Sequence, residues 1–514
     1  MRPVTILLIA TVTTAATLLY ATRLGDVPPY LMHDESKFAL QAISIATSGR
    51  DLTGRLLPIF FTEPEFPAGR DPAVIYLTAA ALAWLPISEA NVRLPVALAG
   101  VVSIVLMFLL ARRLFGRDSM ALMAAVFMAL TPAYFIRSRL ILSPQISVPF
   151  VLAWLLCVAA FSDRPTTRRL AVATGWLGVG AYTYLAGVVM MPIYWLLSAW
   201  IGYRRLGRRV LVVVAVAFAV PLVPMGVWYL THPERMSQVV SAYQLGNSLA
   251  ATSSAAGAGV DAVRKTVGLY WSFFAPEFLF VSGDVSLINS TRQAGVFPLS
   301  FALLIPFGVL QLAKTRRDID LILLAGLFTA PVAAVASGAI EMNRILFVIP
   351  FGVLAAAYGV EWLLLARSRA GAVVAVLLIA AVPLQFAGFY RDYMSRYRVQ
   401  AGAAFGGNTR ELFTAAIART GAERGQPVYV SREILYADRY WRFYALAQGR
   451  PDVIDLFRGY GPTPPLPAPM GSLLACRLVE PGCSGLMAGE QGWQPVHVVS
   501  ELDGTKSFAL FEAR

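Results

Sequence analysis

The sequence is poor in charged residues, in cysteine and in histidine. Charged residues make up 14% of its 514 residues, and it has 3 Cys and 3 His. So few cysteines exclude a disulfide-rich scaffold, and no CxxC or HxxxH spacing suggests a His or Cys metal site. No Walker motif and no convincing nucleotide-binding glycine fingerprint occurs, so a soluble nucleotide ligand is not indicated.

Apolar residues dominate instead. They make up 57% of the chain, and the mean hydropathy is +0.63, well outside the range of ordinary soluble proteins. The composition therefore predicts a multi-pass membrane protein. The net charge of +13 comes from arginines clustered in short loops between apolar segments. That pattern is typical of topology signals, and no nucleic-acid partner is expected.

Roughly eleven apolar segments are predicted to cross the membrane, by the rule of about 20 residues per span. They are 3–22, 91–114, 119–136, 144–161, 170–184, 187–203, 210–230, 297–313, 319–336, 345–366 and 373–389. The run 72–85 is short and suits an interfacial helix. Because the short loops on one side carry the arginines, we expect a protein of the cytoplasmic (inner) membrane with its N-terminus inside and its C-terminus outside.

The segments predict an all-α polytopic transmembrane domain over 1–390, with a first external loop at 23–89 and a long external loop at 231–296. The tail over 391–514 differs, because its apolar runs are short and 408–422 is helical in pattern. It predicts a small extracytoplasmic α/β domain. Cys476 and Cys483 lie close together there, and we expect them to form a disulfide because an exported domain meets an oxidising compartment.

An adjacent acid pair, Asp34-Glu35, follows the first apolar segment. Carboxylates at a membrane edge cost free energy unless a cation, a hydrogen bond or a reaction uses them. Apolar residues recur at helical spacing over 38–45 and Gly49 marks a stop, so Asp34 is expected at a helix N-terminus. Two interpretations stay open: Asp34 caps this helix, or it takes part in chemistry. Glu35 alone is also typical of a solvated first-turn acid.

Short motifs around and after this pair occur in a fixed order. They are His33-Asp34-Glu35, 47–54, 57–61, Arg93-Leu94-Pro95, 112–116, Thr131-Pro132, Ser138-Arg139 and Tyr182-Thr183-Tyr184. In this order they resemble the GT-C glycosyltransferases, in the branch that contains the protein O-mannosyltransferases and the bacterial aminoarabinose transferase. The resemblance covers most of 1–390 and is weak in the tail. The order of the motifs is more specific than any one of them.

The resemblance implies that Asp34 is catalytic, and it makes Glu35, which matches the neighbouring acid of the mannosyltransferases, a second catalytic candidate. It also implies a polyprenyl-phosphate-sugar-dependent glycosyltransferase that acts on the outer membrane face, with inversion, on a lipid, polysaccharide or protein acceptor. A carboxylate can act as the base on the incoming hydroxyl. The alternative is a transporter or flippase for a lipid-linked saccharide. Few acids in the spans and no internal repeat argue against it.

A lipid phosphate would need cations opposite the acid, and four arginines are candidates for donor-phosphate binding. They are Arg70, Arg137, Arg139 and Arg344. Arg137 and Arg139 break the positive-inside pattern, although interfacial arginines that meet lipid headgroups are the alternative. Candidates for the substrate pocket are His33, Tyr76, Tyr182 and Tyr184. An aromatic belt at the membrane edge is the alternative for Tyr182 and Tyr184, and a simple surface histidine for His33.

We expect no obligatory metal, because the second external loop offers Ser143-Pro144-Gln145 without an acid. A divalent metal is the alternative, since oligosaccharyltransferases of the superfamily hold one with the first-loop acid and acids of later loops; Glu277 and Asp284 are candidates. In the tail, 436–443 mixes aromatic and charged residues. A sugar-binding surface and a packed amphipathic helix both fit, and we favour packing.

Overall fold

The computed structural model describes residues 3–63, 66–235, 256–336, 338, 340–366, 368–421, 425–463, 465, 467–487 and 492–514, without the side chains of 63, 66–70, 256–260 and 262. Contact clustering divides the chain into two compact units. Unit 1 comprises Met1–Thr22, Thr53–Tyr76 and Pro95–Arg391, and unit 2 comprises Arg23–Leu52, Leu77–Leu94 and Asp392–Arg514. Unit 2 thus joins part of the first predicted loop to the tail. The domain boundaries drawn from the sequence stay a prediction.

Unit 1 is helical. Its helices are α1 (Pro3–Ala21), α5 (Asp118–Ala129), α6 (Pro132–Arg137), α7 (Ser147–Asp163), α8 (Thr167–Gly180), α9 (Leu185–Leu206), α10 (Arg209–Ala219), α11 (Val223–Thr231), α14 (Ala256–Ser272), α15 (Phe301–Thr315), α16 (Asp318–Thr329), α17 (Val332–Ala336), α18 (Val348–Leu365) and α19 (Arg369–Asp392). Its one-turn helices are η1 (Ser143–Ile146), η2 (Val220–Leu222), η3 (Glu277–Val281) and η4 (Met342–Arg344), and its strands are β1 (Phe61–Glu63) and β2 (Phe66–Arg70). Two further helices, α3 (Pro72–Leu82) and α4 (Glu89–Phe115), contribute residues to both units.

Among the described residues, 8 helices are long and apolar enough to cross a membrane, which indicates a multi-pass membrane protein. Each of the eleven predicted segments contains a helix, but the count of eleven is not confirmed. The segments 119–136, 170–184 and 297–313 hold helices of 12, 14 and 15 residues. In the first of these, Pro132 starts the separate helix α6, because proline cannot continue a helix through its own position without losing a hydrogen bond.

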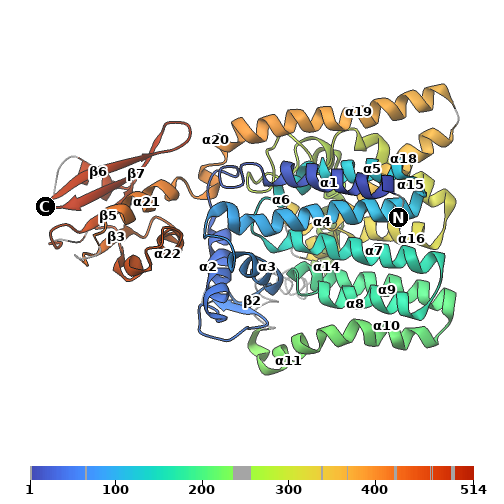
Figure 1. Cartoon of the computed structure of the whole chain (residues 1–514), viewed down its shortest axis with the longest axis horizontal. Helices are drawn as coiled ribbons and strands as arrows, with labels where there is room; N and C mark the ends of the chain where they lie inside the picture. Colours follow the sequence, from blue (N-terminus) through green and yellow to red (C-terminus); the bar gives the residue numbers. More distant parts are fainter. Residues whose placement is uncertain are drawn as a thin grey trace. The chain divides into compact units, whose positions relative to one another are not determined.

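Glycines allow the helices of unit 1 to approach closely. Helices α7, α8, α9 and α10 lie side by side (Figure 1). Between α15 and α18 a Cβ on Gly308 would lie 1.7 Å from the Ala355 carbonyl oxygen, and one on Gly359 would lie 2.0 Å from that of Leu304. Small residues at such crossings are typical of membrane helices, which gain van der Waals contact by close packing.

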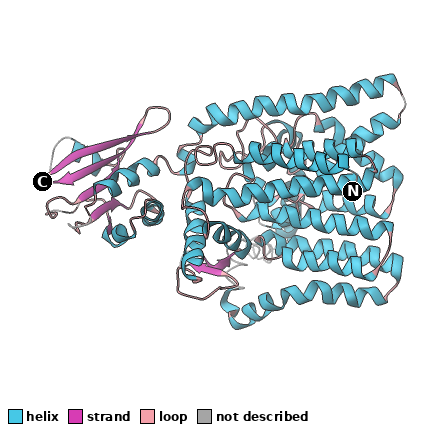
Figure 2. Cartoon of the chain, viewed as in Figure 1, coloured by secondary structure: helices cyan, strands magenta, loops and turns pink. Residues whose placement is uncertain are grey.

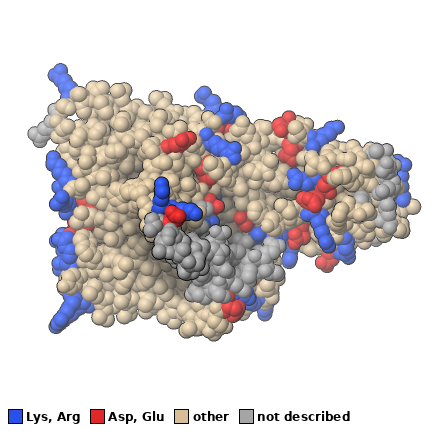
Figure 3. Space-filling view, turned by 180° about the vertical axis from the view of Figure 1, so that it is seen from behind, with Lys and Arg blue, Asp and Glu red and all other residues tan. Residues whose placement is uncertain are grey.

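Basic side chains gather at one end of this helical unit, at the left edge of Figure 3. Helix α4 ends in Arg112 and Arg113, and α9 ends in Arg204 and Arg205. Asp318 at the start of α16 accepts hydrogen bonds from both Arg204 and Arg205. The clustering agrees with the loops that the sequence marked as basic.

Unit 2 holds the sheet. Its helices are α2 (His33–Ser48), α20 (Arg398–Gln400), α21 (Thr409–Arg419), α22 (Ala437–Ala447) and α23 (Pro481–Met487), with the one-turn helices η5 (Tyr393–Tyr397), η6 (Ala403–Phe405) and η7 (Pro451–Leu456). Its strands are β3 (Val428–Ser431), β4 (Phe457–Tyr460), β5 (Leu473–Arg477), β6 (Trp493–Ser500) and β7 (Lys506–Ala513). The strand order is β4-β3-β5-β7-β6, and Figure 2 shows the strands in magenta. Strand β3 is parallel to β4 and β5, and β7 is antiparallel to β5 and β6.

The α/β character predicted for the tail is therefore confirmed. Helix α21 begins after Asn408, whose side chain accepts the Glu411 backbone N–H, as expected of a preferred cap residue. The disulfide between Cys476 and Cys483 is formed, as predicted. It lies in a buried cluster with Trp493 and Phe511.

Helix α22 packs its aromatic residues inward. Tyr440, Trp441, Phe443 and Tyr444 are all buried, and the Trp441 indole donates to the Val453 carbonyl oxygen at 3.1 Å. The packing interpretation is confirmed for Trp441 and Phe443. Tyr436 precedes the helix, and its ring contacts His33 and Lys37 beside the acid pair.

Candidate active site

Helix α2 carries the acid pair in its first turn. It begins at His33 and ends before Gly49, which has a left-handed φ of 68°. Both bounds follow from the sequence, because the apolar spacing defines the helix and a glycine adopts the left-handed C-terminal position without strain. The two acids at its start meet different surroundings.

Glu35 is fully buried and ion-paired with Arg93. The Arg93 guanidinium donates from Nε to Glu35 Oε1 at 2.9 Å and from Nη2 to Oε2 at 2.7 Å. Glu35 Oε2 also accepts the Met32 backbone N–H at 3.2 Å. Both side chains have an exposed fraction of 0%. A buried carboxylate needs such a bidentate partner, since desolvation otherwise costs several kcal/mol.

Arg93 uses its other donors on the backbone of the preceding loop. Nη1 donates to the carbonyl oxygens of Leu24 and Pro28, and Nη2 donates to that of Tyr30. With the two bonds to Glu35, this accounts for all five N–H donors of a guanidinium. Arg93 therefore fixes the path of the loop that leads into α2.

A second buried ion network joins the same loop to the tail. Glu89 accepts from Nε of Arg410 in α21 at 2.7 Å and from the Tyr444 hydroxyl in α22 at 2.7 Å. The Arg410 guanidinium also donates to the carbonyl oxygens of Gly25 and Pro29. The loop before α2 is thus held from both sides, by Arg93 and by a tail arginine.

Asp34 remains accessible, with 36% of its side chain exposed. His33 Nε2 lies 3.6 Å from Asp34 Oδ2, and Lys37 Nζ lies 3.6 Å from Asp34 Oδ1. Lys37 is one turn further along α2, so helical spacing places its ammonium beside the carboxylate. Of the two acids, Asp34 is the one that solvent and substrate can reach.

The ring of Tyr436 organises the groups around Asp34. His33 stacks on it at 4.9 Å with an interplanar angle of 11°, and the cations of Lys37 and Arg439 lie 4.7 and 4.9 Å from its centroid. Such distances are within the range of cation–π attraction. Tyr436 itself has a left-handed φ of 59°, which is uncommon for a residue with a side chain. Burial lowers the pKa of Arg439, and the charge of Asp34 partly restores it.

Two of the candidate phosphate-binding arginines lie near one another within unit 1. Arg137 Nη1 donates to Asn289 Oδ1 at 2.8 Å, and Asn289 donates to Asp284 Oδ2 at 2.9 Å. Asp284 also accepts the Met342 backbone N–H at 2.7 Å, in the same short helix, η4, that carries Arg344. The structure thus connects Arg137, through Asp284, to the turn that holds Arg344.

The other two arginines have different positions. Arg139 is buried, and it donates to the carbonyl oxygens of Tyr20 and Thr22, both at 2.7 Å, so it ties down the end of α1. Arg344 pairs with Glu341 at 2.8 Å and keeps 20% of its side chain exposed. Arg70 ends strand β2, and its side chain lies outside the described residues.

The candidate tyrosines are engaged in packing. The Tyr76 hydroxyl donates to the Pro58 carbonyl oxygen at 2.8 Å. The Tyr182 hydroxyl donates to the Pro221 carbonyl oxygen and accepts the Met225 N–H, within a cluster that includes Phe60. Tyr184 precedes α9 and is half-buried. Within unit 1 the hydroxyls of Tyr76 and Tyr182 stabilise turns.

Metal ligands do not gather in the part of the chain that the structure describes, where no group of three or more His, Cys, Asp or Glu could hold an ion. Of the two metal candidates from the sequence, Glu277 is exposed and Asp284 is buried in the network with Asn289.

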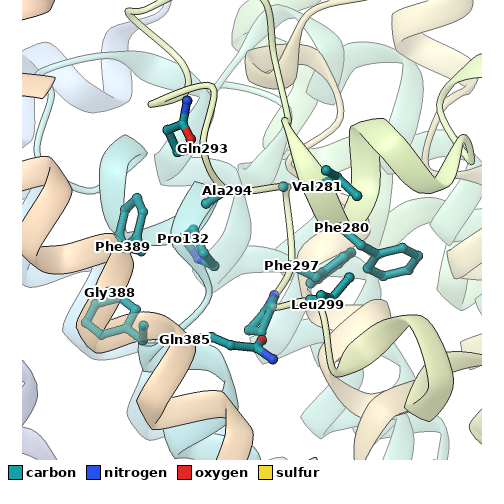
Figure 4. Close-up of a pocket in the computed structure, with 13 residues that line it drawn as sticks. Pro132, Phe280, Val281, Gln293, Ala294, Phe297, Leu299, Gln385, Gly388 and Phe389 are labelled. Carbon is teal, nitrogen blue, oxygen red and sulfur yellow. The ribbon is translucent and has the colours of Figure 1, made fainter.

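Unit 1 also contains an apolar cavity of about 400 Å³. Figure 4 shows the rings of Phe280, Phe297 and Phe389 around it, with Gln293 and Gln385 at opposite ends of the set. The walls come from the segment 280–299, from α19 and from Pro132 at the start of α6. A lining of this kind suits hydrocarbon better than a sugar.

Comparisons with known proteins give one family model and solved structures that this chain resembles. Residues 68–228 match the family model described as dolichyl-phosphate-mannose-protein mannosyltransferase. The structure of ArnT from Cupriavidus metallidurans bound to undecaprenyl phosphate matches with a TM-score of 0.60 at 14% identity, over 98% of this chain and 97% of that chain. Its apo structure matches with a TM-score of 0.57 at 15% identity and the same coverage.

The chain has the GT-C glycosyltransferase fold. The resemblance to the O-mannosyltransferase and aminoarabinose transferase branch, predicted from the motifs, is confirmed, and so is the fold class. The S. cerevisiae protein O-mannosyltransferase Pmt1-Pmt2 complex bound to the sugar donor has a TM-score of 0.34 at 18% identity, over 46% of this chain and 34% of that chain. No curated protein matches the chain in sequence.

Sequence reasoning missed the roles of three residues around the acid pair, namely Arg93, Lys37 and Tyr436. A signal for Arg93 existed, since it begins a span on the predicted external side and so breaks the positive-inside pattern, as Arg137 does. Lys37 could have been found from its helical spacing to Asp34. Nothing local points to Tyr436, which lies 402 residues from Asp34 in the chain.

Proposed function

We propose that the protein transfers a sugar from a polyprenyl-phosphate carrier to a hydroxyl of a lipid, polysaccharide or protein acceptor. The observation that carries the proposal is Asp34, an accessible carboxylate at the start of α2, in a chain with the fold of ArnT. That ArnT binds undecaprenyl phosphate in its solved structure supports the donor class.

In this reaction Asp34 is the base. It removes the proton from the acceptor hydroxyl while the hydroxyl oxygen attacks the anomeric carbon. The bond between that carbon and the phosphate oxygen breaks, and polyprenyl phosphate leaves with the electron pair. A single displacement inverts the anomeric centre, and no covalent sugar-enzyme intermediate forms. A positioned carboxylate contributes about 10² to 10⁴-fold to such a step.

We assign Glu35, which the resemblance marks as catalytic, to a positioning role, because it is fully buried against Arg93. His33 and Lys37 flank the base. The proposed contacts for the donor phosphate remain Arg70, Arg137, Arg139 and Arg344. Among them the proposal is best supported for Arg344, because 20% of its side chain is exposed. Tyr76, Tyr182 and Tyr184 remain proposed residues of the substrate pocket.

The proposed location is the cytoplasmic membrane, with the N-terminus inside and the tail on the outer face. The gathering of basic side chains at one end of unit 1 supports this orientation (Figure 3), because short cytoplasmic loops carry an excess of Lys and Arg. The disulfide in the tail supports export of that region.

Transfer from a defined donor tests the proposal. Purified protein in lipid nanodiscs is incubated with radiolabelled sugars on undecaprenyl phosphate and, separately, with the same sugars as nucleotide diphosphates, together with total membrane lipid and protein. We expect label to reach an acceptor fraction only from the lipid-linked donors. Transfer from nucleotide sugars alone, or from no donor, would refute the proposal.

We further propose that no metal is obligatory. The buried hydrogen bonds of Asp284 and the cations on both sides of Asp34 support this view. Protein treated with EDTA and then assayed without added metal is expected to keep its transfer rate within about twofold. A loss of activity that Mg²⁺ or Mn²⁺ restores would instead establish a metal-dependent reaction.

A further inference from the structure

Unit 2 contains a cavity of about 330 Å³ next to the acid pair. This volume is within the range of small-molecule sites, about 300 to 1,000 Å³. The walls come from the start of α2, from the turn 403–406, from the segment before α22 and from the ends of β5 and β7. The residues that carry polar or aromatic groups are His33, Tyr436, Tyr440, Arg477 and Phe508.

Three cations, Arg477, Lys37 and Arg439, lie in or beside the wall of this cavity, and the charge of Asp34 faces the latter two. Arg477 lies in the wall, with its guanidinium 5.9 Å from the Phe508 ring centroid. Lys37 and Arg439 lie against the ring of Tyr436, which also lines the cavity. The residues that line it include no Asp or Glu. A cleft bounded by cations favours an anionic ligand.

Besides Asp34, two acids behind the wall are already bonded. Glu480 accepts the Arg477 backbone N–H at 2.8 Å and the Ser431 hydroxyl at 2.6 Å. Glu501 accepts the Tyr30 hydroxyl and the Asn408 backbone N–H, both at 2.9 Å. These carboxylates are held by other donors, so the cationic wall stays open to a ligand.

The cavity leads to the base. His33 lines it and lies 3.6 Å from Asp34. Tyr440 also lines it, and its pKa is raised, first by burial and then by the negative charges of Glu35 and Asp34. A ligand in the cavity would therefore lie against His33, the immediate neighbour of Asp34.

We propose that this cavity is the acceptor subsite and that it takes an anionic saccharide, with the phosphate or carboxylate on Arg477 and the sugar against Tyr436, Tyr440 and Phe508. A guanidinium pairs with either anion through two parallel hydrogen bonds, and aromatic rings give the sugar apolar contact area. The assignment to the acceptor rests on the proposed function, since the same Asp34 removes the acceptor proton.

Direct binding tests the subsite without any transfer reaction. Full-length protein in nanodiscs is titrated calorimetrically with glucose 6-phosphate, glucuronate and glucose. We expect a charged sugar to bind and glucose to bind at least about tenfold more weakly, because a hydrogen bond to a charged group contributes roughly 1.5 to 3 kcal/mol. Preference between the two charged sugars tells phosphate from carboxylate as the recognised group.

Two variants complete the test. Arg477→Gln is expected to weaken binding of the charged sugar about 10- to 100-fold, with the donor KM unchanged and the acceptor KM raised. Arg442→Gln is the matched control, since Arg442 lies exposed on α22 and does not line the cavity, and it should bind as the native protein does. Equal binding by all three proteins, or tight binding of glucose, would overturn the subsite and leave the donor reaction untouched. Specific loss in Arg477→Gln supports it even if no polyprenyl donor is used.

Discussion

Asp34→Asn is expected to lower kcat/KM for sugar transfer by about 10² to 10⁴-fold, because an amide cannot accept the acceptor proton. The structure explains why transfer should be lost while the protein still folds. Asp34 is partly exposed, and the side chains of His33 and Lys37 lie 3.6 Å from its carboxylate. The substitution keeps the shape of the side chain but removes the negative charge beside Lys37, whose side chain is only 7% exposed. We therefore expect a loss of transfer far larger than any fall in the melting temperature. Transfer of radiolabel from a polyprenyl-phosphate sugar is the measurement.

Two further variants show whether activity depends on the position of the Asp34 carboxylate or only on the negative charge of the unit. Asp34→Glu keeps a carboxylate but moves it by one methylene, and it is expected to retain more activity than Asp34→Asn. Asp452→Asn removes an exposed acid of the same unit, which is paired with its neighbour Arg450, and it should leave transfer unchanged. If Asp34→Asn transfers sugar at the native rate, Asp34 is not the base.

Local pattern was enough to predict the elements that carry the acid pair. The helix α2 and its stop at Gly49 follow from apolar spacing and from glycine at the left-handed position. The tail strands β3, β6 and β7 follow from short apolar runs. These signals depend on neighbours within a few residues, which the sequence displays directly.

Long-range pairings could not be predicted in this way. Glu35 meets Arg93 at a separation of 58 residues, and Glu89 meets Arg410 at 321. The sequence shows that each charge exists but not which partner neutralises it. Because of these pairings, the predicted first loop and tail do not stay apart. They share unit 2, so the tail supports the segment that holds Asp34.

The candidate phosphate site shows the same limit. The positive-inside rule selected Arg137 and Arg139 as arginines that topology does not explain. It could not tell that Arg139 binds the carbonyl oxygens at the end of α1, whereas Arg137 joins the network of Asn289 and Asp284. The rule identifies arginines that topology does not explain. Only the fold shows whether such an arginine stabilises the structure or is placed to bind a ligand.

Arg93→Met is expected to be among the most destabilising single substitutions in unit 2, costing about 3 to 5 kcal/mol, because it leaves the carboxylate of Glu35 buried without its partner. It also removes the donors that hold the carbonyl oxygens of Leu24, Pro28 and Tyr30. Thermal unfolding of the purified protein, followed by the loss of monodisperse protein on size-exclusion chromatography, measures the effect.

A double-mutant cycle shows whether the ion pair itself is responsible. Glu35→Gln removes the charge and keeps the shape, and the double variant Arg93→Met with Glu35→Gln leaves no isolated charge. We expect the double variant to be more stable than Arg93→Met alone, since its buried side chain no longer carries an unpaired charge. Additive losses would mean that Arg93 stabilises the loop through its carbonyl contacts rather than through Glu35. In either case activity should fall with stability in Arg93→Met, whereas Asp34→Asn should lose far more activity than stability. That contrast separates the residue that performs the chemistry from the pair that holds it in place.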